Sequence, residues 1–240
     1  MYSIKSLLCG IPIGIALILE LAIPHSAASL VKVAQLKQSN PPPPPENPDS
    51  SAPGGRRAPT ACPQDEATTT SPALTALSPT TKPGLSLAEH PTFLVYVPKT
   101  SAKTAEFSIR NRNGRGVYRT TLALTNTPDI VSISLPPQAP PLEIGKQYTW
   151  SFAMICNPSD RVEDRFVTGI VQRTELDPTR ASQIEQASPK ERISLYQKAD
   201  IWYDPLTILF ELRRTQPNDP SLSVIWREFL QSGGVDAMMR

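Results

Sequence analysis

The chain has 240 residues, 27 of them proline, and its 24 basic and 22 acidic residues give a net charge of +2. This balance provides no electrostatic case for binding nucleic acid or an anionic membrane surface, so no nucleic-acid partner is predicted. The many prolines argue against a single core that uses the whole chain.

Residues 1–28 have the three-part layout of a secretory signal peptide. Lys5 supplies a positive charge before an apolar run over residues 7–23, and Ser26 and Ala28 are small residues at the two positions that a signal peptidase reads. We therefore predict that this segment is removed and that the protein is exported, to the periplasm or to the cell surface.

Two other interpretations of this N-terminal segment stay open. A retained membrane anchor requires about 20 apolar residues, whereas this run is shorter and is interrupted by glycines, Pro12 and Glu20. A lipid-modified Cys9 is the second alternative, although Leu8 is large for the position before such a cysteine. A membrane is therefore an expected partner only if the signal sequence is retained as an anchor.

Residues 29–84 are predicted to form a proline-rich, disordered linker. Pro41 to Pro45 form an uninterrupted polyproline run, and proline, glycine, serine and threonine are frequent in the residues that follow. Such a segment has too few apolar residues to bury a core. We interpret it as a stiff spacer, with recognition of the polyproline run by another domain as the alternative.

Residues 85–175 predict an antiparallel β-sandwich. Short runs of alternating apolar and polar residues, rich in β-branched and aromatic types, are separated by turn residues such as Asn113 and Gly114. Seven or so strands with one apolar face each must pack sheet on sheet, so we expect an α+β fold whose first part is immunoglobulin-like in general architecture. The expected strands lie around residues 85–87, 93–97, 105–109, 118–124, 131–135, 150–156 and 167–171.

Residues 188–234 predict a C-terminal segment of three helices. Each expected helix begins with a capping side chain followed by proline, at Ser188, Asp204 and Asp219. The cap oxygen accepts a hydrogen bond from a free backbone N–H, and proline loses nothing at the first helical position. Apolar residues then recur at helical spacing until Gly233 ends the last helix.

The chain has three cysteines, of which Cys9 leaves with the signal peptide. Cys62 and Cys156 remain, and we predict that they form a disulfide in an oxidising compartment. The bridge would close a loop of about 95 residues, for which the chain-entropy model gives a stabilisation of roughly 4–5 kcal/mol. Two buried thiols are the first alternative. A metal or redox pair is the second, and the lack of a CxxC motif and the single mature histidine speak against it.

A search for catalytic residues yields little. His90 is the only histidine of the mature chain, and its neighbour Glu89 would point to the opposite face of a strand. Sequence motifs for a hydrolase nucleophile, a zinc protease or a phosphate-binding loop do not occur. We therefore predict no catalytic residue, no metal site, no cofactor and no enzymatic activity.

Two loops have both a ligand-binding and a structural interpretation. Residues 111–116 are basic and glycine-rich, so their backbone N–H groups either cradle an anion or simply close a hairpin, which we favour. The carboxylates of Asp160, Glu163 and Asp164 either hold calcium or form a solvated turn. The second interpretation is favoured because the ligand alternation and glycine of a calcium loop are missing.

The helical region carries the remaining candidates. Trp202, Tyr203 and Trp226 either form an exposed aromatic patch for carbohydrate or protein or belong to the core, which their helical spacing favours. Arg213 and Arg214 end the second expected helix, where cations favour the helix dipole, and a role in partner binding is the alternative.

Several segments together resemble a cyanobacterial family known as domain of unknown function 928, over roughly residues 56–235. The matching segments read RRAPTACPQDEA, LTALSP, GLSLAEHPTFLVYVP, YRTTLAL, PPLEIGKQYTWSFAMICNPSDRVEDRF, IWYDPLTILFELR and WREFLQSGGVDA. The resemblance implies a cyanobacterial envelope protein. It brings no activity, substrate or catalytic residue with it.

We expect an exported, non-enzymatic binding or structural module of the cell envelope, with an unidentified envelope protein or glycan as its partner. An open groove lined by Trp202, Trp226 and Phe229 would be the binding surface in one version of this expectation. The alternative is an envelope carbohydrate-binding protein or hydrolase that uses the carboxylates of the acidic loop, with Trp150 or His90.

Overall fold

The computed structural model of the protein describes residues 61–65 and 72–235. All of these residues belong to one compact unit. The predicted signal peptide, the polyproline run and most of the predicted linker lie outside the described residues.

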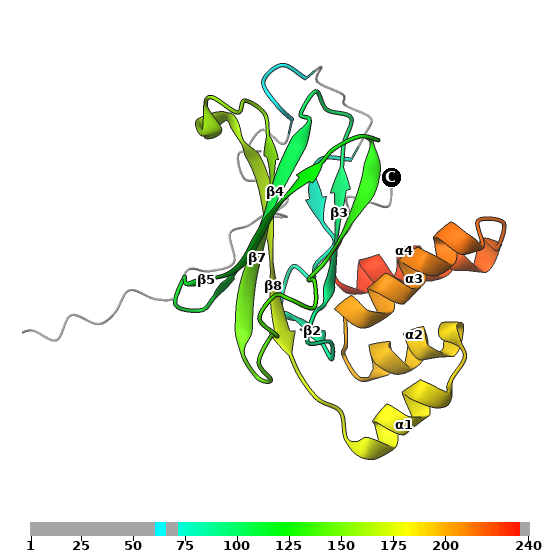
Figure 1. Ribbon diagram of the computed structural model, residues 1–240. Helices are drawn as coiled ribbons and strands as arrows, with labels where there is room; N and C mark the ends of the chain where they lie inside the picture. The colour runs from blue at the N-terminus through cyan, green and yellow to red at the C-terminus, as the bar shows by residue number, and fades with distance from the viewer. Residues whose placement is uncertain (1–60, 66–71, 236–240) are drawn as a thin grey trace, which may run out of the picture. The chain divides into compact units, whose positions relative to one another are not determined.

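The strands of the described part form two mostly antiparallel sheets (Figure 1). They are β1 Thr75–Ala76, β2 Gly84–Ser86, β3 Thr92–Val97, β4 Thr104–Asn111, β5 Gly116–Ala123, β6 Asp129–Ser134, β7 Gln147–Ile155 and β8 Arg165–Arg173. One sheet has the order β1-β3-β6 and the other has the order β2-β8-β7-β4-β5. Among the paired strands of the described residues, only β2 and β8 run parallel, which differs from the purely antiparallel arrangement expected from the sequence.

Alternation of apolar and polar residues forms the long strands, as predicted. In β7 the side chains of Trp150, Phe152 and Met154 are buried, and the residues between them are more exposed. Trp150 pairs with Gly169 of β8, where a Cβ atom would lie 2.6 Å from the indole ring. Glycine is therefore required at this position because the indole occupies the space of a side chain.

The two sheets share one core. Phe93 of β3 has its ring centroid 5.2 Å from that of Phe107 on β4 and 5.3 Å from that of Trp150 on β7. All three side chains are completely buried. Contacts of this kind between aromatic rings add to the free energy of burying their surfaces.

Helices follow the strands and complete an α+β fold. They are α1 Pro178–Gln186, α2 Pro189–Lys198, α3 Tyr203–Thr215 and α4 Pro220–Ser232, with a short 3-10 helix, η1, at Arg161–Glu163 between β7 and β8. Asp177, Ser188 and Asp219 cap α1, α2 and α4 with their side chains. The cap predictions at Ser188 and Asp219 are thus confirmed.

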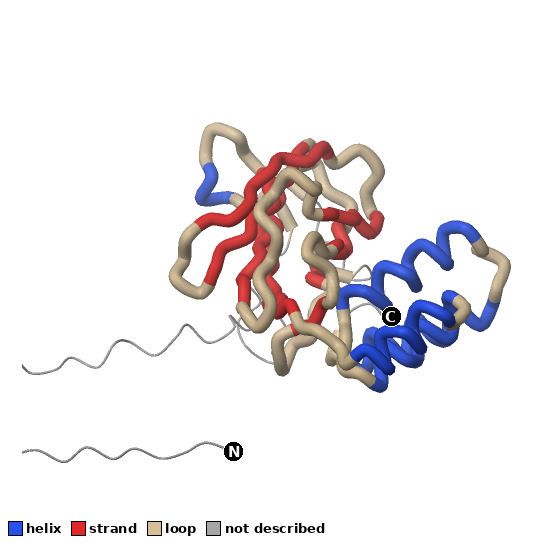
Figure 2. Tube along the Cα trace, turned by 60° about the horizontal axis from the view of Figure 1, so that its bottom comes forward, coloured by secondary structure: helices blue, strands red, loops and turns tan. Residues whose placement is uncertain are grey.

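The helices pack beside the three-stranded sheet and β2. Helix α3 contacts β3 and β2 as well as α2 and α4, and Figure 2 shows α1 to α4 gathered on one side of the strands. Leu94 of β3 is completely buried, although it points away from Phe93. The helical layer therefore covers a second apolar face of β3, whereas β4 and β5 lie on the far side (Figure 1).

Three expectations from the sequence need correction. The described C-terminal region has four helices, because α1 precedes the predicted segment 188–234. The predicted linker 29–84 extends too far, because β1 pairs with β3 and Leu74 and Leu77 are buried. Asp204 does not cap α3, which begins one residue earlier. Its carboxylate instead accepts a hydrogen bond of 3.1 Å from the backbone N–H of Leu87 and so ties the helix to the chain after β2.

None of the helices within residues 61–65 and 72–235 combines the length and the hydrophobicity needed to span a bilayer.

Candidate functional site

A buried hydrogen-bond network centres on the hydroxyl of Tyr203. Trp150 Nε1 donates to this oxygen at 2.8 Å, Ser78 Oγ lies 3.0 Å from it, and the hydroxyl donates to the carbonyl of Ile170 at 3.0 Å. Burial raises the pKa of Tyr203, so the phenol stays neutral at physiological pH. The network links α3 to both β7 and β8 and to the segment before β2, which is a structural task.

The helical aromatic residues also belong to the core. Trp202 and Trp226 are 7% and 6% exposed, and Phe229 is 1% exposed. The rings of Trp202 and Phe229 lie 4.5 Å apart, and Trp202 Nε1 donates to the carbonyl of Leu77 at 3.0 Å. Arg213 lies over the ring of Trp226 at 4.6 Å, and burial lowers its pKa. The expectation that these aromatic side chains line a groove open to solvent is therefore wrong, because all three are buried.

A pocket of about 180 Å³ lies between residues 79–84 and the C-terminal ends of α2 and α4, and Trp202 and Phe229 are among its lining residues. Lys82 and Asp200 both line it and form an ion pair with each other. Since its charged groups neutralise one another, the pocket offers little to attract a charged ligand.

His90 and Glu89 are engaged separately. His90 Nε2 lies 2.9 Å from the carbonyl oxygen of Ala139, and Glu89 Oε1 accepts from Arg173 Nη2 at 2.9 Å. The structure does not bring the two side chains together as a base and its orienting carboxylate.

Two carboxylates of the acidic loop, those of Asp160 and Asp164, likewise form local hydrogen bonds. Asp160 caps η1 by accepting from the N–H of Val162 at 3.1 Å, and Asp164 accepts from Arg161 Nε at 2.6 Å. Nowhere in the described residues do three or more His, Cys, Asp or Glu side chains gather as a metal site would require.

Cys62 and Cys156, the pair predicted to be bridged, form a disulfide with a Cα–Cα distance of 5.4 Å. Gln64 Nε2 donates to the carbonyl of Cys156 at 2.7 Å, and Arg165 Nε donates to the carbonyl of Ala61 at 3.0 Å. The bond therefore lies within a set of contacts that fastens residues 61–65 to the end of the five-stranded sheet.

Asp65 is the hub of this fastening and was not singled out in the sequence. Its carboxylate accepts hydrogen bonds from the N–H of Cys62, from the hydroxyl of Thr100 and from both the N–H and the hydroxyl of Ser101. Burial alone would raise the pKa of Asp65, but these hydrogen bonds outweigh it and lower the pKa. Only the tertiary contacts reveal this role, because sequence spacing gives no sign of them.

The turn between β4 and β5 uses its own backbone donors. Asn111 Oδ1 accepts from the N–H groups of Asn113 and Arg115, each at 3.0 Å, and Gly114 donates to the carbonyl of Asn111. Gly114 has φ +77°, a conformation that favours glycine. These N–H groups are therefore not available to cradle an anion, which supports the hairpin interpretation.

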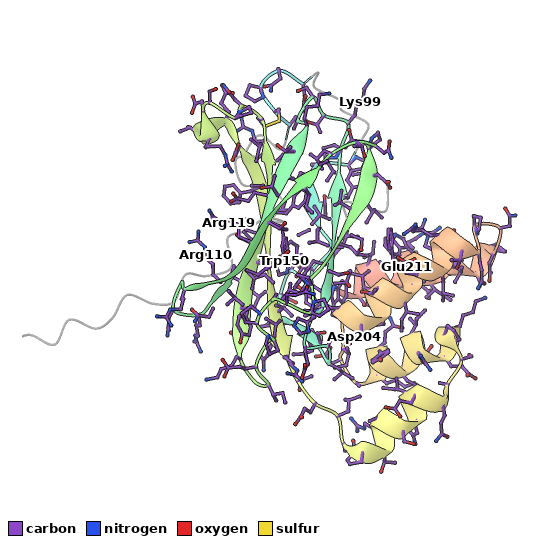
Figure 3. The ribbon with its side chains drawn as sticks, in the orientation of Figure 1. Lys99, Arg110, Arg119, Trp150, Asp204 and Glu211 are labelled. Carbon is purple, nitrogen blue, oxygen red and sulfur yellow. A yellow bond between two sulfur atoms is a disulfide. The ribbon has the colours of Figure 1, made fainter. Side chains whose placement is uncertain are left out.

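Every second side chain of this hairpin, in contrast, extends from the outer face of the five-stranded sheet, the face opposite the shared core. Arg110 and Arg119 are exposed there (Figure 3). Cross-strand pairing aligns Arg119 with Ser108 and Ser108 with Ser151, and it aligns Arg110 with Thr149. Residues that pair across strands share a face, so these arginines and hydroxyls form one surface.

Apolar exposure adds to the same outer face. Phe166 of β8 is 63% exposed and pairs with Ala153 of β7, which pairs with Glu106 of β4. Glu106 forms ion pairs with two arginines. Its Oε1 lies 3.7 Å from Arg119 Nε, and its Oε2 lies 3.9 Å from Arg161 Nη1. We call the set Glu106, Ser108, Arg110, Arg119, Thr149, Ser151, Ala153 and Phe166 the outer platform.

Comparison with known proteins gives the family but no activity. Comparison with curated proteins finds no match. The solved structure of CopC from Methylosinus trichosporium OB3b is 14% identical, covers 43% of this chain and 98% of its own, and has a TM-score of 0.27, so it carries no argument about function.

A family model described as Domain of Unknown Function (DUF928) matches residues 52–240. The match spans the cysteine pair, both sheets and the helices. The chain therefore belongs to the DUF928 family.

Proposed function

We propose that the protein is an exported, non-enzymatic binding module of the cell envelope, built on an immunoglobulin-like β-sandwich. The observation that carries this proposal is the outer platform. Arg110, Arg119 and Thr149 are exposed on it, whereas the helices contact β2 and β3. A rigid sheet that presents exposed polar side chains on one face is a common base for binding a partner.

Export is supported by the disulfide and by the N-terminal sequence. A buried bridge between Cys62 and Cys156 suits an oxidising compartment. The predicted signal peptide of residues 1–28 would deliver the chain there. We expect the protein isolated from cells to begin at Ser29, and N-terminal sequencing that finds Met1 would contradict cleavage.

The engagement of the candidate catalytic groups supports a non-enzymatic role. Asp160 caps η1, Asp164 forms an ion pair with Arg161, and the ring of His90 lies at hydrogen-bond distance from a backbone carbonyl. These contacts speak against the alternative of a hydrolase that uses the acidic loop. They leave a carbohydrate-binding role open, since that role needs no catalytic pair.

Site-specific photocrosslinking in intact cells tests the proposal. A photoreactive phenylalanine analogue replaces Thr149 on the outer platform or, as a control, Val224 on α4, which is 47% exposed. We expect a reproducible envelope component to be captured from position 149 and not from position 224. Capture from neither position, or equal capture from both, would contradict a binding face on this sheet.

A further inference from the structure

We infer that the outer platform and the adjoining β4–β5 turn bind an anionic glycan, a polysaccharide that carries carboxylate or sulfate groups. This inference rests on the proposed function, since it names the partner of the same face. It is carried by local charge, by the placement of the arginines and by the polarity of the surface between them.

The charge of the hairpin differs from that of the chain as a whole. Residues 103–123 contain five Lys or Arg residues and one acidic residue, Glu106, whereas the full chain has a net charge of only +2. Arg110, Arg112, Arg115 and Arg119 are all exposed. A basic cluster on an otherwise balanced surface attracts a polyanion locally although the net charge does not.

Two of the acidic groups near the platform, Glu106 and Asp164, pair with arginines. Glu106 lies between Arg119 and Arg161, and Asp164 pairs with Arg161. Within the described residues, Arg110 has no carboxylate at ion-pair distance, and the same holds for Arg112 and Arg115 at the turn. Since no described carboxylate occupies them, their guanidinium groups can meet anions of a partner.

The geometry suits an extended anionic chain. Neighbouring strands lie about 4.8 Å apart, and residues two apart along a strand are separated by about 7 Å. Arg119 and Arg110 therefore stand in adjacent rows of one face, beside the hydroxyls of Ser108 and Thr149. Arginine forms paired hydrogen bonds with planar oxyanions, so each guanidinium matches one carboxylate or sulfate group.

The surface between the arginines favours a glycan over a membrane. Serine and threonine hydroxyls both donate and accept hydrogen bonds, as sugar hydroxyls do. Phe166, 63% exposed, adds apolar surface that can contact a sugar ring on the same platform. The turn over residues 111–116 contains only Asn, Arg and Gly, so it has no apolar side chain to insert between lipids.

Binding to defined polymers tests this inference. The full mature chain, with its disulfide formed, is passed over immobilised polygalacturonate, neutral dextran, and vesicles of phosphatidylcholine with phosphatidylglycerol. We expect binding to polygalacturonate that weakens as salt is raised, and none to dextran. The double variant R110Q/R119Q should bind about 10-fold more weakly, the order expected for losing two exposed ion pairs.

The matched control carries the same change of charge elsewhere. R180Q/R227Q removes two exposed arginines from α1 and α4 and should bind within about 2-fold of the unchanged protein, because exposed charges at a distance are screened. Equal losses in both double variants would overturn the inference, since net charge alone would then explain binding. Circular dichroism of both variants checks that each is folded.

Two other outcomes also overturn the inference and separate it from the proposed function. Stronger binding to the vesicles than to polygalacturonate would make a membrane the partner. Failure to bind polygalacturonate, combined with a protein captured from position 149 in cells, would leave the binding face standing and remove the anionic glycan.

Discussion

The C-terminal helices and the β4–β5 hairpin both carry residues typical of binding sites, yet they use them in opposite ways. Residues 177–232 hold seven basic and eight acidic residues, and their large aromatic side chains face inward. Residues 103–123 hold five basic residues and one acidic residue, and their arginines face outward. Residue type alone therefore does not mark a binding surface, because the packing partners decide which side chains remain exposed.

The largest expected effect comes from removing a helical aromatic ring. Trp202→Ala should lower the free energy of unfolding by about 4 kcal/mol, the range for deleting a buried tryptophan. The change removes the contact with Phe229 and leaves the carbonyl of Leu77 without its donor. Urea denaturation monitored by circular dichroism measures the loss.

Phe166→Ala is the matched control for this prediction, since Phe166 is 63% exposed on the outer platform. Its unfolding free energy should stay within about 0.5 kcal/mol of the unchanged protein. If the two variants lost equal stability, the division into a buried helical layer and an exposed platform would be wrong.

Loss of the disulfide should come next in size. Cys62→Ser combined with Cys156→Ser should lower the free energy of unfolding by about 3 kcal/mol, because the bridge restricts the unfolded chain over 94 residues of sequence. This loss is smaller than the value from the chain-entropy model, since measured losses often fall below that model. The hydrogen bonds of Asp65 to Thr100 and Ser101 remain in this variant and should keep part of the attachment. Urea denaturation of this variant and of the bridged protein measures the difference in unfolding free energy. An unchanged midpoint of urea denaturation would argue that the bridge contributes nothing to stability.

Removal of the Tyr203 hydroxyl should lower the free energy of unfolding by less than Trp202→Ala or loss of the disulfide. Tyr203→Phe keeps the ring but leaves Trp150 Nε1 and the carbonyl of Ile170 without their partner. Unsatisfied buried groups of this kind cost about 2 kcal/mol in unfolding free energy. Tyr118→Phe, on the partly exposed β5, is the control and should leave stability nearly unchanged.

The smallest expected effect is a pH dependence from Asp204. Burial raises the pKa of Asp204, and hydrogen bonds from Ser86 and from the N–H of Leu87 offset this only in part. The folded state thus holds this proton more tightly than the unfolded state. Stability from this group is greatest below about pH 4, the unfolded pKa of an aspartate, and falls as pH rises through the folded pKa.

Asp204→Asn removes that ionisation. The slope of unfolding free energy against pH above pH 4 should become less negative, by at most about 1.4 kcal/mol per pH unit for a single group. Asp129→Asn, at an exposed position of β6, serves as the control. Identical slopes for Asp204→Asn and the unchanged protein would show that burial does not disturb this carboxylate.

Local patterns predicted the parts of the fold that local interactions form. The hairpin at Asn113 and Gly114 and the caps at Ser188 and Asp219 depend on residues close in sequence, and the structure contains them all. Helix α1 was missed although Asp177 and Pro178 carry the same cap pattern. Its only buried residue is Ile184, so the apolar period that would have confirmed it is absent.

Features that depend on distant contacts could not be predicted. Asp204 has the local pattern of a cap, but its carboxylate accepts a hydrogen bond from the backbone N–H of Leu87 instead. The two residues of β1 are too few to show a period, and their pairing with β3 defines them. The outer platform exists only because strand register places Arg119 beside Ser108 and Arg110 beside Thr149.

Hydrogen–deuterium exchange of the bridged protein, with and without polygalacturonate, tests whether the five-stranded sheet carries the binding face. We expect slower exchange in β4, β5 and β7, with the helices unchanged. Slower exchange confined to the C-terminal helices, or no change in either region, would contradict a binding face on the five-stranded sheet.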